Sequence, residues 1–235
     1  MRKIISIVFL VFFVSTNAQT GLFNDVLQKH VDNQGNVNYK GLKQDEAKLD
    51  MYIRYLASTS PDKSWSINKQ KAFWINAYNA YTIKLILENY PLKSITKIKK
   101  NGKTAWKIPF ANVGGKLYTL DHIEHKILRK NLFDPKIHVG VNCASASCPK
   151  LANIAFTEEN IETELTRLMK DFINDTSKNK VSKKKLQISS IFDWFKDDFT
   201  KNGSVIDYFN KYLEMEINSN AKISYLEYDW SLNSK

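Results

Sequence analysis

The sequence lacks the motifs that define several common enzyme classes. It contains no glycine-rich phosphate-binding loop, no GxSxG motif, no HExxH motif and no internal repeat. These absences leave nucleotide-binding P-loop proteins, α/β-hydrolases, zincin-type metalloproteases and repeat proteins without support. Any chemistry must therefore be sought in less standard combinations of residues.

Long apolar runs are also scarce, and the only one stands at the N-terminus. Arg2 and Lys3 precede the apolar residues 4–14, and small or polar residues follow up to Ala18. This order predicts a secretory signal peptide over residues 1–18, cleaved near Ala18, and hence an exported protein of the periplasm or the extracellular space. The run is too short to cross a bilayer comfortably, so we expect no membrane-spanning segment.

Acidic residues are too few to balance the basic ones. The chain has 24 Asp and Glu against 35 Lys and Arg, a formal net charge of +11. Such a charge suits an anionic partner. The lysines gather at residues 97–103 and 178–185, beside turn-forming residues, and we interpret both groups as solvated loops. We expect a small molecule, a peptide or an anionic wall polymer as substrate and no nucleic acid, and the oligomeric state stays open.

The remaining sequence predicts one mixed domain. Hydrophobic residues make up 43% of the chain, enough for a sizeable core. Apolar periodicity and turn residues predict helices and short strands that alternate after an early helical part. The expected fold class is α+β, with a long buried central helix, several further helices and a small, mostly antiparallel sheet. We expect an N-terminal helical segment over 19–64 that packs on a main domain over 65–235.

The positions of the predicted elements follow from caps, turns and apolar spacing. Asp121 and Thr157 stand where helices should begin, and Gly114 and Gly115 form a hairpin turn. The predicted helices cover about 22–31, 44–56, 68–89, a segment from 121, a segment from 157, and 205–213. The predicted strands cover 37–39, 106–113, 116–120, 137–141, 186–188 and 222–230.

The helix predicted over 68–89 carries two unusual amides. Its apolar residues spread over more than half of the circumference, so it should be buried on several sides. Asn76 and Asn79 lie three residues apart and face one side. Buried amides need hydrogen-bond partners, so we interpret them first as ties to loop backbone and second as substrate contacts.

Both cysteines lie in the stretch 136–151. Alternation of apolar residues over 137–141 predicts a strand that ends in a small, polar loop. His138 and Asn142 should share the outer face of this strand. Cys143 follows the inward-facing Val139 and Val141 at a spacing of two residues, so we expect its side chain to be buried and inert. Cys148 should be exposed and reactive.

A group of titratable residues precedes this stretch. Asp121, His122 and His125 have spacings that could serve a metal or a general base. A pair of surface histidines is the more common case, and we expect no metal and no cofactor. Arg129, four residues after His125, suits an ion pair or a helix end better than a substrate contact.

Four blocks of sequence resemble one family. These blocks lie at residues 71–87, 117–151, 191–199 and 227–233. They are similar to successive parts of the DUF547 family, which occurs in exported bacterial proteins and in plants and animals. The resemblance covers most of the mature chain and implies a fold-sized match without implying a reaction.

The resemblance also implies a set of family positions. The residues of this chain that fit the family pattern are Asn76, Asn79, Asp121, Glu124, His125, Arg129, His138, Cys148 and Pro149. His122 occupies a position that is often acidic in the family, which weakens a metal site built on it. Some plant members are joined to glutaredoxin-like domains, an association with thiol chemistry.

Three hypotheses of function remain open at this stage. The first is a cysteine hydrolase or acyltransferase. The second is a binding module stabilised by a disulfide between Cys143 and Cys148, because paired cysteines in exported proteins usually form one. The third is a thiol redox protein. For the first, the candidate catalytic residues are Cys148, His125, Glu124 and His138, and the candidate substrate-binding residues are Asn76, Asn79, Arg129 and Asn142.

Overall fold

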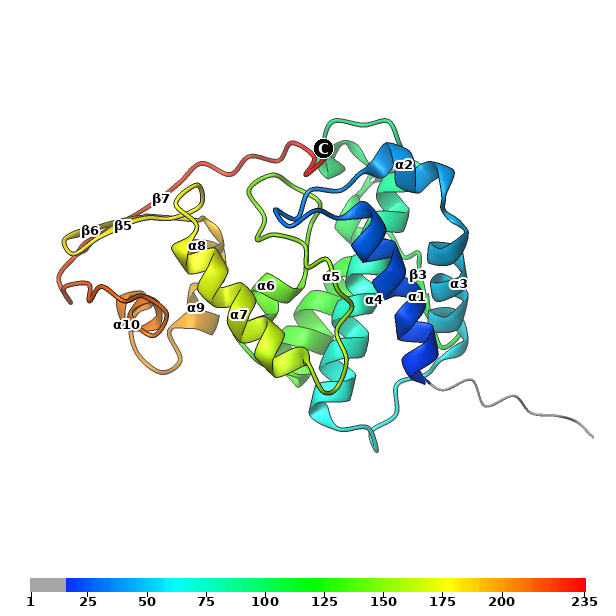
Figure 1. Cartoon of the computed structure of the whole chain (residues 1–235), viewed down its shortest axis with the longest axis horizontal. Coiled ribbons are helices and arrows are strands. Elements are labelled where there is room, and N and C mark those ends of the chain that lie inside the picture. The colour runs from blue at the N-terminus through cyan, green and yellow to red at the C-terminus, as the bar shows by residue number, and fades with distance from the viewer. Residues whose placement is uncertain (1–15) are drawn as a thin grey trace, which may run out of the picture.

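The computed structural model describes residues 16–235. The signal peptide expected over residues 1–18 therefore lies almost entirely outside the described residues. The described part is an α+β fold, as predicted. Figure 1 shows α1, α3 and α4 on one side of the molecule and the small sheet β5–β6–β7 with α10 on the other. The main helices are α1 (Thr16–His30), α2 (Tyr39–Gln44), α3 (Ala47–Ser58), α4 (Ile67–Glu88) and α7 (Ile161–Asn174).

Helix α4 is the centre of the core. The side chain of Ser66 caps its start by accepting the N–H of Lys69. The helix ends at Glu88, and its C-cap Asn89 stands two residues before Pro91. Residues 71–83 of α4 are all buried, which confirms the predicted long buried helix. α3 and α7 pack against it, and α1 packs on α3. The N-terminal helices thus cover the same core that holds the cysteine-bearing stretch 136–151.

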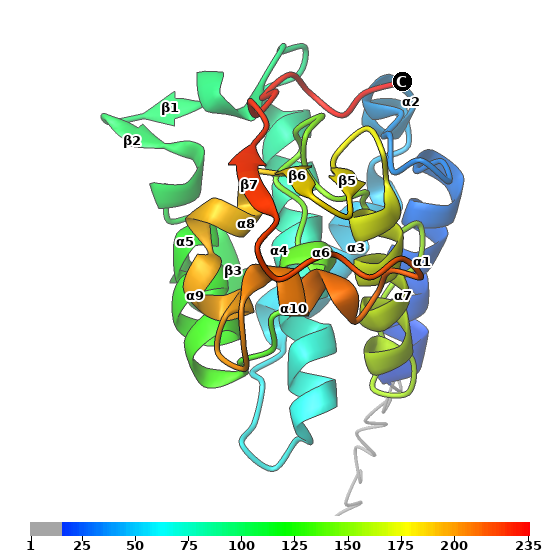
Figure 2. The ribbon, with the colours of Figure 1, turned by 90° about the vertical axis from the view of Figure 1, so that its left-hand side faces the viewer.

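The sheets are short and lie at the periphery. β1 (Lys99–Lys100) pairs with β2 (Lys103–Thr104), and β3 (Ala111–Val113) pairs with β4 (Lys116–Tyr118), both antiparallel. β5 (Lys180–Ser182) is antiparallel to β6 (Lys185–Ile188), which is parallel to β7 (Lys222–Tyr225). Figure 2 shows the β1–β2 hairpin projecting from the molecule. The predicted hairpin turn at Gly114 and Gly115 is confirmed, with φ of 57° and 78°.

Short helical turns connect these elements. They are η1 (Ile95–Lys97), η2 (Ala105–Lys107), α5 (Leu120–His122), α6 (Ile137–Gly140), α8 (Ile191–Trp194), α9 (Lys196–Phe199) and α10 (Val205–Asn210). A π-helix, η3 (Ile123–Asn131), continues α5. Helices of this type are rare, and where they occur as bulges they are frequent at functional sites.

The strand predicted over residues 137–141 is wrong, because this segment forms the single helical turn α6. No described strand runs beside it, so side chains help to satisfy its backbone hydrogen bonds. Asn79 Nδ2 donates to the carbonyl of Gly140, 2.8 Å away. A Cβ atom on Gly140 would lie 2.8 Å from Leu165 of α7 and 3.0 Å from Ile75 of α4. Glycine therefore allows α6 to pack directly between these two helices.

Four smaller predictions also differ from the structure. Trp106 lies in the turn η2 and not in a strand, and Tyr39 begins α2 instead of ending a strand. Thr119, and not Asp121, caps α5, because its hydroxyl accepts the N–H of His122 at 2.9 Å. Asn160 precedes α7, so the helix begins later than Thr157. Each error concerns a few residues at an element boundary, where local turns compete with regular structure.

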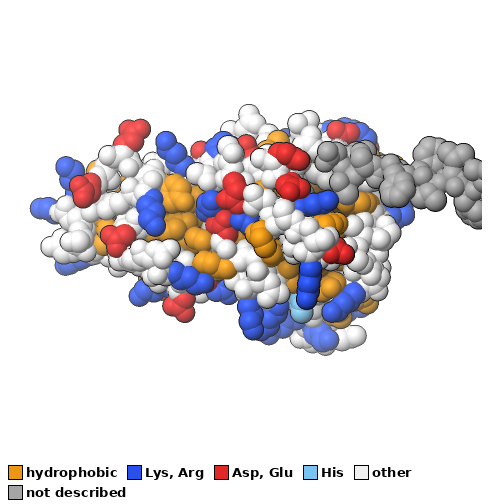
Figure 3. Space-filling model, turned by 90° about the horizontal axis from the view of Figure 1, so that it is seen from below, with side chains coloured by type: hydrophobic (Ala, Val, Ile, Leu, Met, Phe, Trp, Pro, Cys, Tyr) orange, Lys and Arg blue, Asp and Glu red, His pale blue; other side chains and the backbone are white. Residues whose placement is uncertain are grey.

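Lysine and arginine side chains are spread over the surface. On the face shown in Figure 3 they lie among neutral and acidic side chains instead of forming one patch. The lysines of β1 and β2 are exposed. This distribution agrees with the interpretation of the lysine-rich segments as solvated loops.

Candidate functional site

The loop that carries both cysteines, residues 141–149, is shaped by a single amide. Asn142 Nδ2 donates to the carbonyl of Pro149 at 2.9 Å, and Asn142 Oδ1 accepts the N–H of Ala144 at 2.8 Å. Between these bonds Ala144 has a φ of 57°. This left-handed conformation costs an alanine roughly 1–2 kcal/mol, so the surrounding hydrogen bonds must hold it. The result is a tight turn that brings the two thiols together.

The two sulfur atoms lie 3.2 Å apart and share a hydrogen bond. The backbone N–H of Cys143 also donates to the sulfur of Cys148 at 3.2 Å. A disulfide bond measures about 2.05 Å, so both residues are free thiols here. The disulfide expected in one of the three hypotheses is not formed in this structure.

Cys143 lies among hydrogen-bonding groups that favour its thiolate. Its sulfur is 3.1 Å from Ser145 Oγ and 3.3 Å from the hydroxyl of Tyr228. The hydrogen bond with the Cys148 thiol, assisted by these two hydroxyls and opposed by burial, lowers the pKa of Cys143 to about 6. The lowered pKa favours the thiolate of Cys143, which is the nucleophilic form.

Cys148 has the opposite character. Only 7% of its surface is exposed. Burial raises the pKa of Cys148 well above its usual value, and the adjacent charge of Cys143 raises it further. The predicted burial of the two cysteines is thus wrong: Cys148 is the buried thiol, and Cys143 is partly exposed. The prediction relied on a strand, and the helical turn α6 takes the place of that strand. Which of the two thiols reacts stays a prediction.

The C-terminal segment, residues 226–235, lies against the thiol loop. The N–H groups of Ala146 and Ser147 donate to the carbonyls of Ser231 and Asp229, at 2.7 Å and 3.1 Å. In return the N–H of Asp229 donates to Ser147 Oγ at 2.8 Å. In Figure 1 this segment, in red, runs from β7 across the molecule to end beside α2. These bonds place Tyr228 and Trp230 beside the cysteines.

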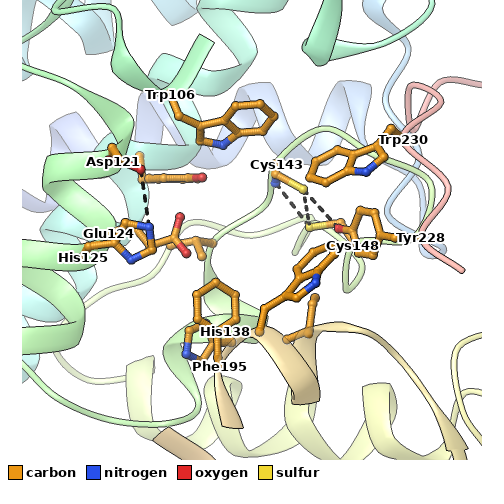
Figure 4. Close-up of a pocket in the computed structure, with 14 residues that line it drawn as sticks. Trp106, Asp121, Glu124, His125, His138, Cys143, Cys148, Phe195, Tyr228 and Trp230 are labelled. Carbon is orange, nitrogen blue, oxygen red and sulfur yellow. Dashed lines mark hydrogen bonds and ion pairs between the residues drawn. The ribbon is translucent and has the colours of Figure 1, made fainter. Parts of the chain in front are cut away.

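The thiols open onto a cavity of about 230 Å³. Figure 4 shows Glu124 and His125 on one side of it and the two cysteines on the other, with Trp230 and Tyr228 next to the cysteines. The lining brings together α4, η2, η3, the thiol loop, α8 and the C-terminal segment. Cys143, Cys148, Glu124, His125 and His138, five of the residues singled out from the sequence, all line this one space.

Glu124 is a buried carboxyl group on η3. It interacts with the hydroxyl of Tyr78, which comes from α4. Burial raises the pKa of Glu124 above its usual value, although His125, Tyr78 and Arg129 oppose the rise. A carboxyl group with a raised pKa in a cavity is a candidate proton donor.

His125 has both ring nitrogens engaged. Arg129 Nη1 donates to its Nδ1 at 2.9 Å, so Nε2 carries the proton and faces Asp121 Oδ1 at 3.4 Å. Among the described residues, no histidine is hydrogen bonded to either sulfur. The thiol–imidazole pair expected from the sequence is therefore not formed in this state.

His138 and Arg129 converge on Asp198 of α9. Arg129 Nε and His138 Nε2 lie 2.6 Å and 2.8 Å from the same oxygen, Asp198 Oδ2. Burial opposes ionisation of Asp198, but the hydrogen bonds from His138 and Arg129 place its pKa well below the usual value. Burial lowers the pKa of His138, and its ring stacks on Phe195 at 4.1 Å. The predicted pairing of Arg129 with an acid is thus present.

The two asparagines of α4 bind backbone, as interpreted from the sequence. Asn79 Oδ1 accepts the N–H of Asn142 at 2.9 Å, and Asn76 bonds both backbone groups of Phe156, at 2.7 Å and 3.0 Å. Asn79 thereby fixes the start of the thiol loop. Neither these residues nor Arg129 and Asn142 line the cavity, so their substrate-binding role stays a prediction.

The remaining histidines lie outside the cavity. His122 is exposed and contacts the ring of Tyr118, 5.3 Å between centroids. His30, the last residue of α1, is buried and lies 3.2 Å from Asp45 Oδ2. Within residues 16–235 no group of three or more His, Cys, Asp or Glu side chains could hold a metal ion. No helix in this described range is long and apolar enough to cross a membrane.

Residues 63–173 match the model of a family described as "Protein of unknown function, DUF547". This segment belongs to the DUF547 family. It contains α4, η3 and the thiol loop, and it ends in α7. No curated protein and no solved structure matches the chain. The DUF547 segment thus contains both cysteines and Glu124, but not the residues of α8 and the C-terminal segment that complete the cavity.

Sequence reasoning missed several residues of the site. They are Tyr78, Trp106, Ser145, Trp194, Asp198, Tyr228 and Trp230. One signal was available: aromatic residues are dense over 225–230, on a segment too polar to be a core strand. The partners of that segment could not be predicted, because more than 80 residues separate Tyr228 from Ser145.

Proposed function

We propose that this DUF547 protein carries out thiol–disulfide exchange, with Cys143 as the attacking thiolate and Cys148 as the resolving thiol. The observation that supports it best is the asymmetry of the pair. Two free sulfurs lie 3.2 Å apart, and their environments separate their pKa values in opposite directions. A dithiol oxidoreductase needs one exposed, ionised thiol and one protected thiol within reach of it.

The proposed reaction has two steps. The Cys143 thiolate attacks one sulfur of a substrate disulfide, forms a mixed disulfide and releases the other half of the substrate as a thiolate. Cys148 then loses its proton and attacks the sulfur of Cys143, which forms the Cys143–Cys148 disulfide and releases the second half. The substrate is reduced by two electrons and the protein is oxidised by two. A small thiol or another dithiol protein returns the pair to the reduced state.

The surroundings suit both steps. The attacking thiol has a pKa near neutral pH, where the balance of thiolate fraction and nucleophilicity is best. Once Cys143 has entered a mixed disulfide, its negative charge is gone, so one cause of the raised pKa of Cys148 disappears. The second thiol is thus activated by the first step. Export, as predicted from residues 1–18, would place the protein where disulfides persist.

The test uses the mature chain and the neutral reagent 4,4′-dithiodipyridine. The wild type should release two equivalents of thiopyridone and end with an internal disulfide, which mass spectrometry distinguishes from two adducts by its lower mass. Cys148→Ser should release one equivalent and keep a mixed disulfide on Cys143. Cys143→Ser should react much more slowly. Two stable adducts on the wild type, one on each cysteine, would reject the exchange mechanism.

A cysteine-dependent acyl transfer is the second candidate, and the position of Glu124 favours it. This carboxyl group has a raised pKa and lies across the cavity from the nucleophile. It could protonate a leaving group after Cys143 had attacked an ester or amide carbonyl. The two functions differ in their need for Cys148. Turnover of an aryl ester that survives Cys148→Ser but not Cys143→Ser or Glu124→Gln would favour acyl transfer.

A further inference from the structure

The wall of the cavity beside the thiols is built from aromatic rings that contact one another in stacked, tilted and edge-on pairs. Trp194 contacts Tyr228 at 4.8 Å and Trp230 at 5.9 Å, and Trp230 contacts Trp106 at 5.6 Å, between ring centroids. Trp194 remains 48% exposed although it is a large apolar residue. Indole faces carry negative potential and attract cations as well as flat apolar groups. The wall could therefore hold either kind of ligand.

The charges of the lining decide between these ligands. Asp121, Glu124 and the Cys143 thiolate all contribute negative charge when ionised, whereas no lysine or arginine is present among the described lining residues. Arg129 contacts His125 behind the lining, but its charge is paired with Asp198 at 2.6 Å. The cavity therefore combines aromatic faces with anionic groups, which is the chemistry of sites that recognise organic cations.

The size of the cavity limits the ligand further. Its volume of about 230 Å³ is below the range of roughly 300–1,000 Å³ that is usual for whole small-molecule ligands. One amino-acid side chain or a short aliphatic chain would fill it. A substrate that reacts at Cys143 would then place only the group next to its reacting sulfur in the cavity.

We infer that the cavity selects disulfide substrates whose reacting half carries an ammonium or guanidinium group, held by the faces of Trp194 and Trp230 and by Glu124. This inference rests on the proposed thiol–disulfide exchange and names its substrate class. Such a group would also offset the cost of ionising the buried carboxyl of Glu124, since it supplies the missing counter-charge. The chain as a whole carries a net charge of +11. Its long-range field would favour anionic substrates, so a preference for cations can arise only locally.

The test compares three small disulfides of similar length. They are cystamine with two ammonium groups, bis(2-hydroxyethyl) disulfide without charge, and 3,3′-dithiodipropionate with two carboxylates. The rate of mixed-disulfide formation on Cys143 is measured by mass spectrometry in the Cys148→Ser variant, which stops after one step. Each rate is divided by that of free N-acetylcysteamine, a neutral thiol that differs from all three leaving groups, with the same reagent, which removes differences in intrinsic reactivity.

We expect cystamine to exceed the neutral disulfide by roughly 2- to 30-fold after this correction, the range of cation–π contacts. The carboxylate reagent should be the slowest. Glu124→Gln and Trp230→Leu should each reduce the ratio of the cystamine rate to the rate with the neutral reagent, and circular dichroism checks that both variants are folded. The matched control is Glu227→Gln, an exposed carboxyl beside Tyr228 that does not line the cavity, and it should keep the preference.

The outcomes separate the two proposals. Equal corrected rates for all three reagents, or a faster reaction with the carboxylate, would overturn the cation preference and leave the exchange reaction intact. The cation preference would also be overturned if Glu124→Gln and Glu227→Gln reduced the preference for cystamine equally, because the preference would then come from the general surface charge. Failure of Cys143 to react with any of the three reagents would instead reject the proposed function itself.

Discussion

At the scale of single residues, the two cysteines differ because their neighbours differ. The sulfur of Cys143 lies within hydrogen-bonding distance of Ser145 in the same loop and of Tyr228 in the C-terminal segment, whereas Cys148 is buried. The sequence placed both thiols correctly in one loop but predicted their burial in reverse. Successive side chains alternate between two faces only in a strand, so the single helical turn α6 does not place Cys143 on the inward face.

Alkylation should show this difference directly. Iodoacetamide should modify Cys143 before Cys148, and its rate should rise with pH through about pH 6, because the lowered pKa of Cys143 makes the thiolate available above that value. Peptide mass spectrometry after short exposures between pH 5 and 9 measures both sites. Faster labelling of Cys148, or a midpoint near the ordinary thiol value of about 8.5, would contradict the assignment.

Tyr228 should help to set the pKa of Cys143. Its hydroxyl lies 3.3 Å from the sulfur and 2.9 Å from Ser145 Oγ, so Tyr228→Phe removes one of the bonds that favour the thiolate. We expect the alkylation midpoint of Cys143 to move to higher pH by roughly 0.5 to 1 unit, corresponding to about 1 kcal/mol for one hydrogen bond. The matched control is Tyr225→Phe, an exposed tyrosine on β7. An equal shift in both variants would exclude a direct contact as the cause.

At the scale of elements, periodicity predicted the long helices well and the short turns poorly. α4 was predicted within about one residue at each end, because its apolar face, its N-cap and Pro91 all act locally. α6 was mistaken for a strand because four residues carry too little periodic signal. What decides its conformation is tertiary: Asn79 binds its carbonyl end, and Gly140 permits contact with α4 and α7. Neither effect can be read from the segment itself.

Asp198 joins three elements, because Arg129 of η3 and His138 of α6 both bind the same oxygen of α9. Asp198→Asn would leave this arginine and this histidine without their charged partner. We expect a loss of about 3 kcal/mol in the free energy of unfolding. Urea unfolding monitored by circular dichroism measures it. Asp193→Asn, at an exposed position on α8, is the control and should change it by less than about 0.5 kcal/mol. Similar losses in both variants would contradict the proposed role of the bonds from Arg129 and His138 to Asp198.

The same group predicts how stability depends on pH. The pKa of His138 is lowered in the folded protein, so the unfolded chain binds a proton more readily, and stability should fall as pH drops below about 6.5. The pKa of Asp198 is also lowered, so its contribution is lost at more acid pH, below about 3.9. His138→Gln should flatten the decline in stability that begins near pH 6.5 and leave the decline at more acid pH unchanged. A wild type whose free energy of unfolding stays constant from pH 7 to 5 would contradict this sign.

At the scale of the whole molecule, the site combines the DUF547 segment with the C-terminal part of the chain. The DUF547 segment provides the thiol loop, Glu124 and Trp106, while residues beyond position 173 provide the rest of the aromatic wall and the hydroxyl of Tyr228 beside Cys143. Asn233 connects these parts. Its Oδ1 accepts the hydroxyl of Tyr39 at 2.8 Å, its Nδ2 donates to Asn142 Oδ1 and Gly35 at 3.3 Å each, and its N–H donates to Ala144 at 3.2 Å. Contacts between residues almost 200 positions apart leave no local pattern in a sequence.

Replacing Asn233 should therefore disturb the thiols from a distance. Asn233→Ala removes the partner of the buried hydroxyl of Tyr39 and loosens the bond between the C-terminal segment and the thiol loop. We expect a loss of roughly 1–3 kcal/mol in the free energy of unfolding, the cost of an unsatisfied buried polar group. The alkylation midpoint of Cys143 should rise as well, since Tyr228 is then held less firmly. Asn220→Ala, at an exposed position before β7, should change neither quantity. A variant that loses stability but keeps the midpoint would show that Tyr228 is positioned without Asn233, and that the C-terminal segment reaches the thiols through its bonds to Ala146 and Ser147 alone.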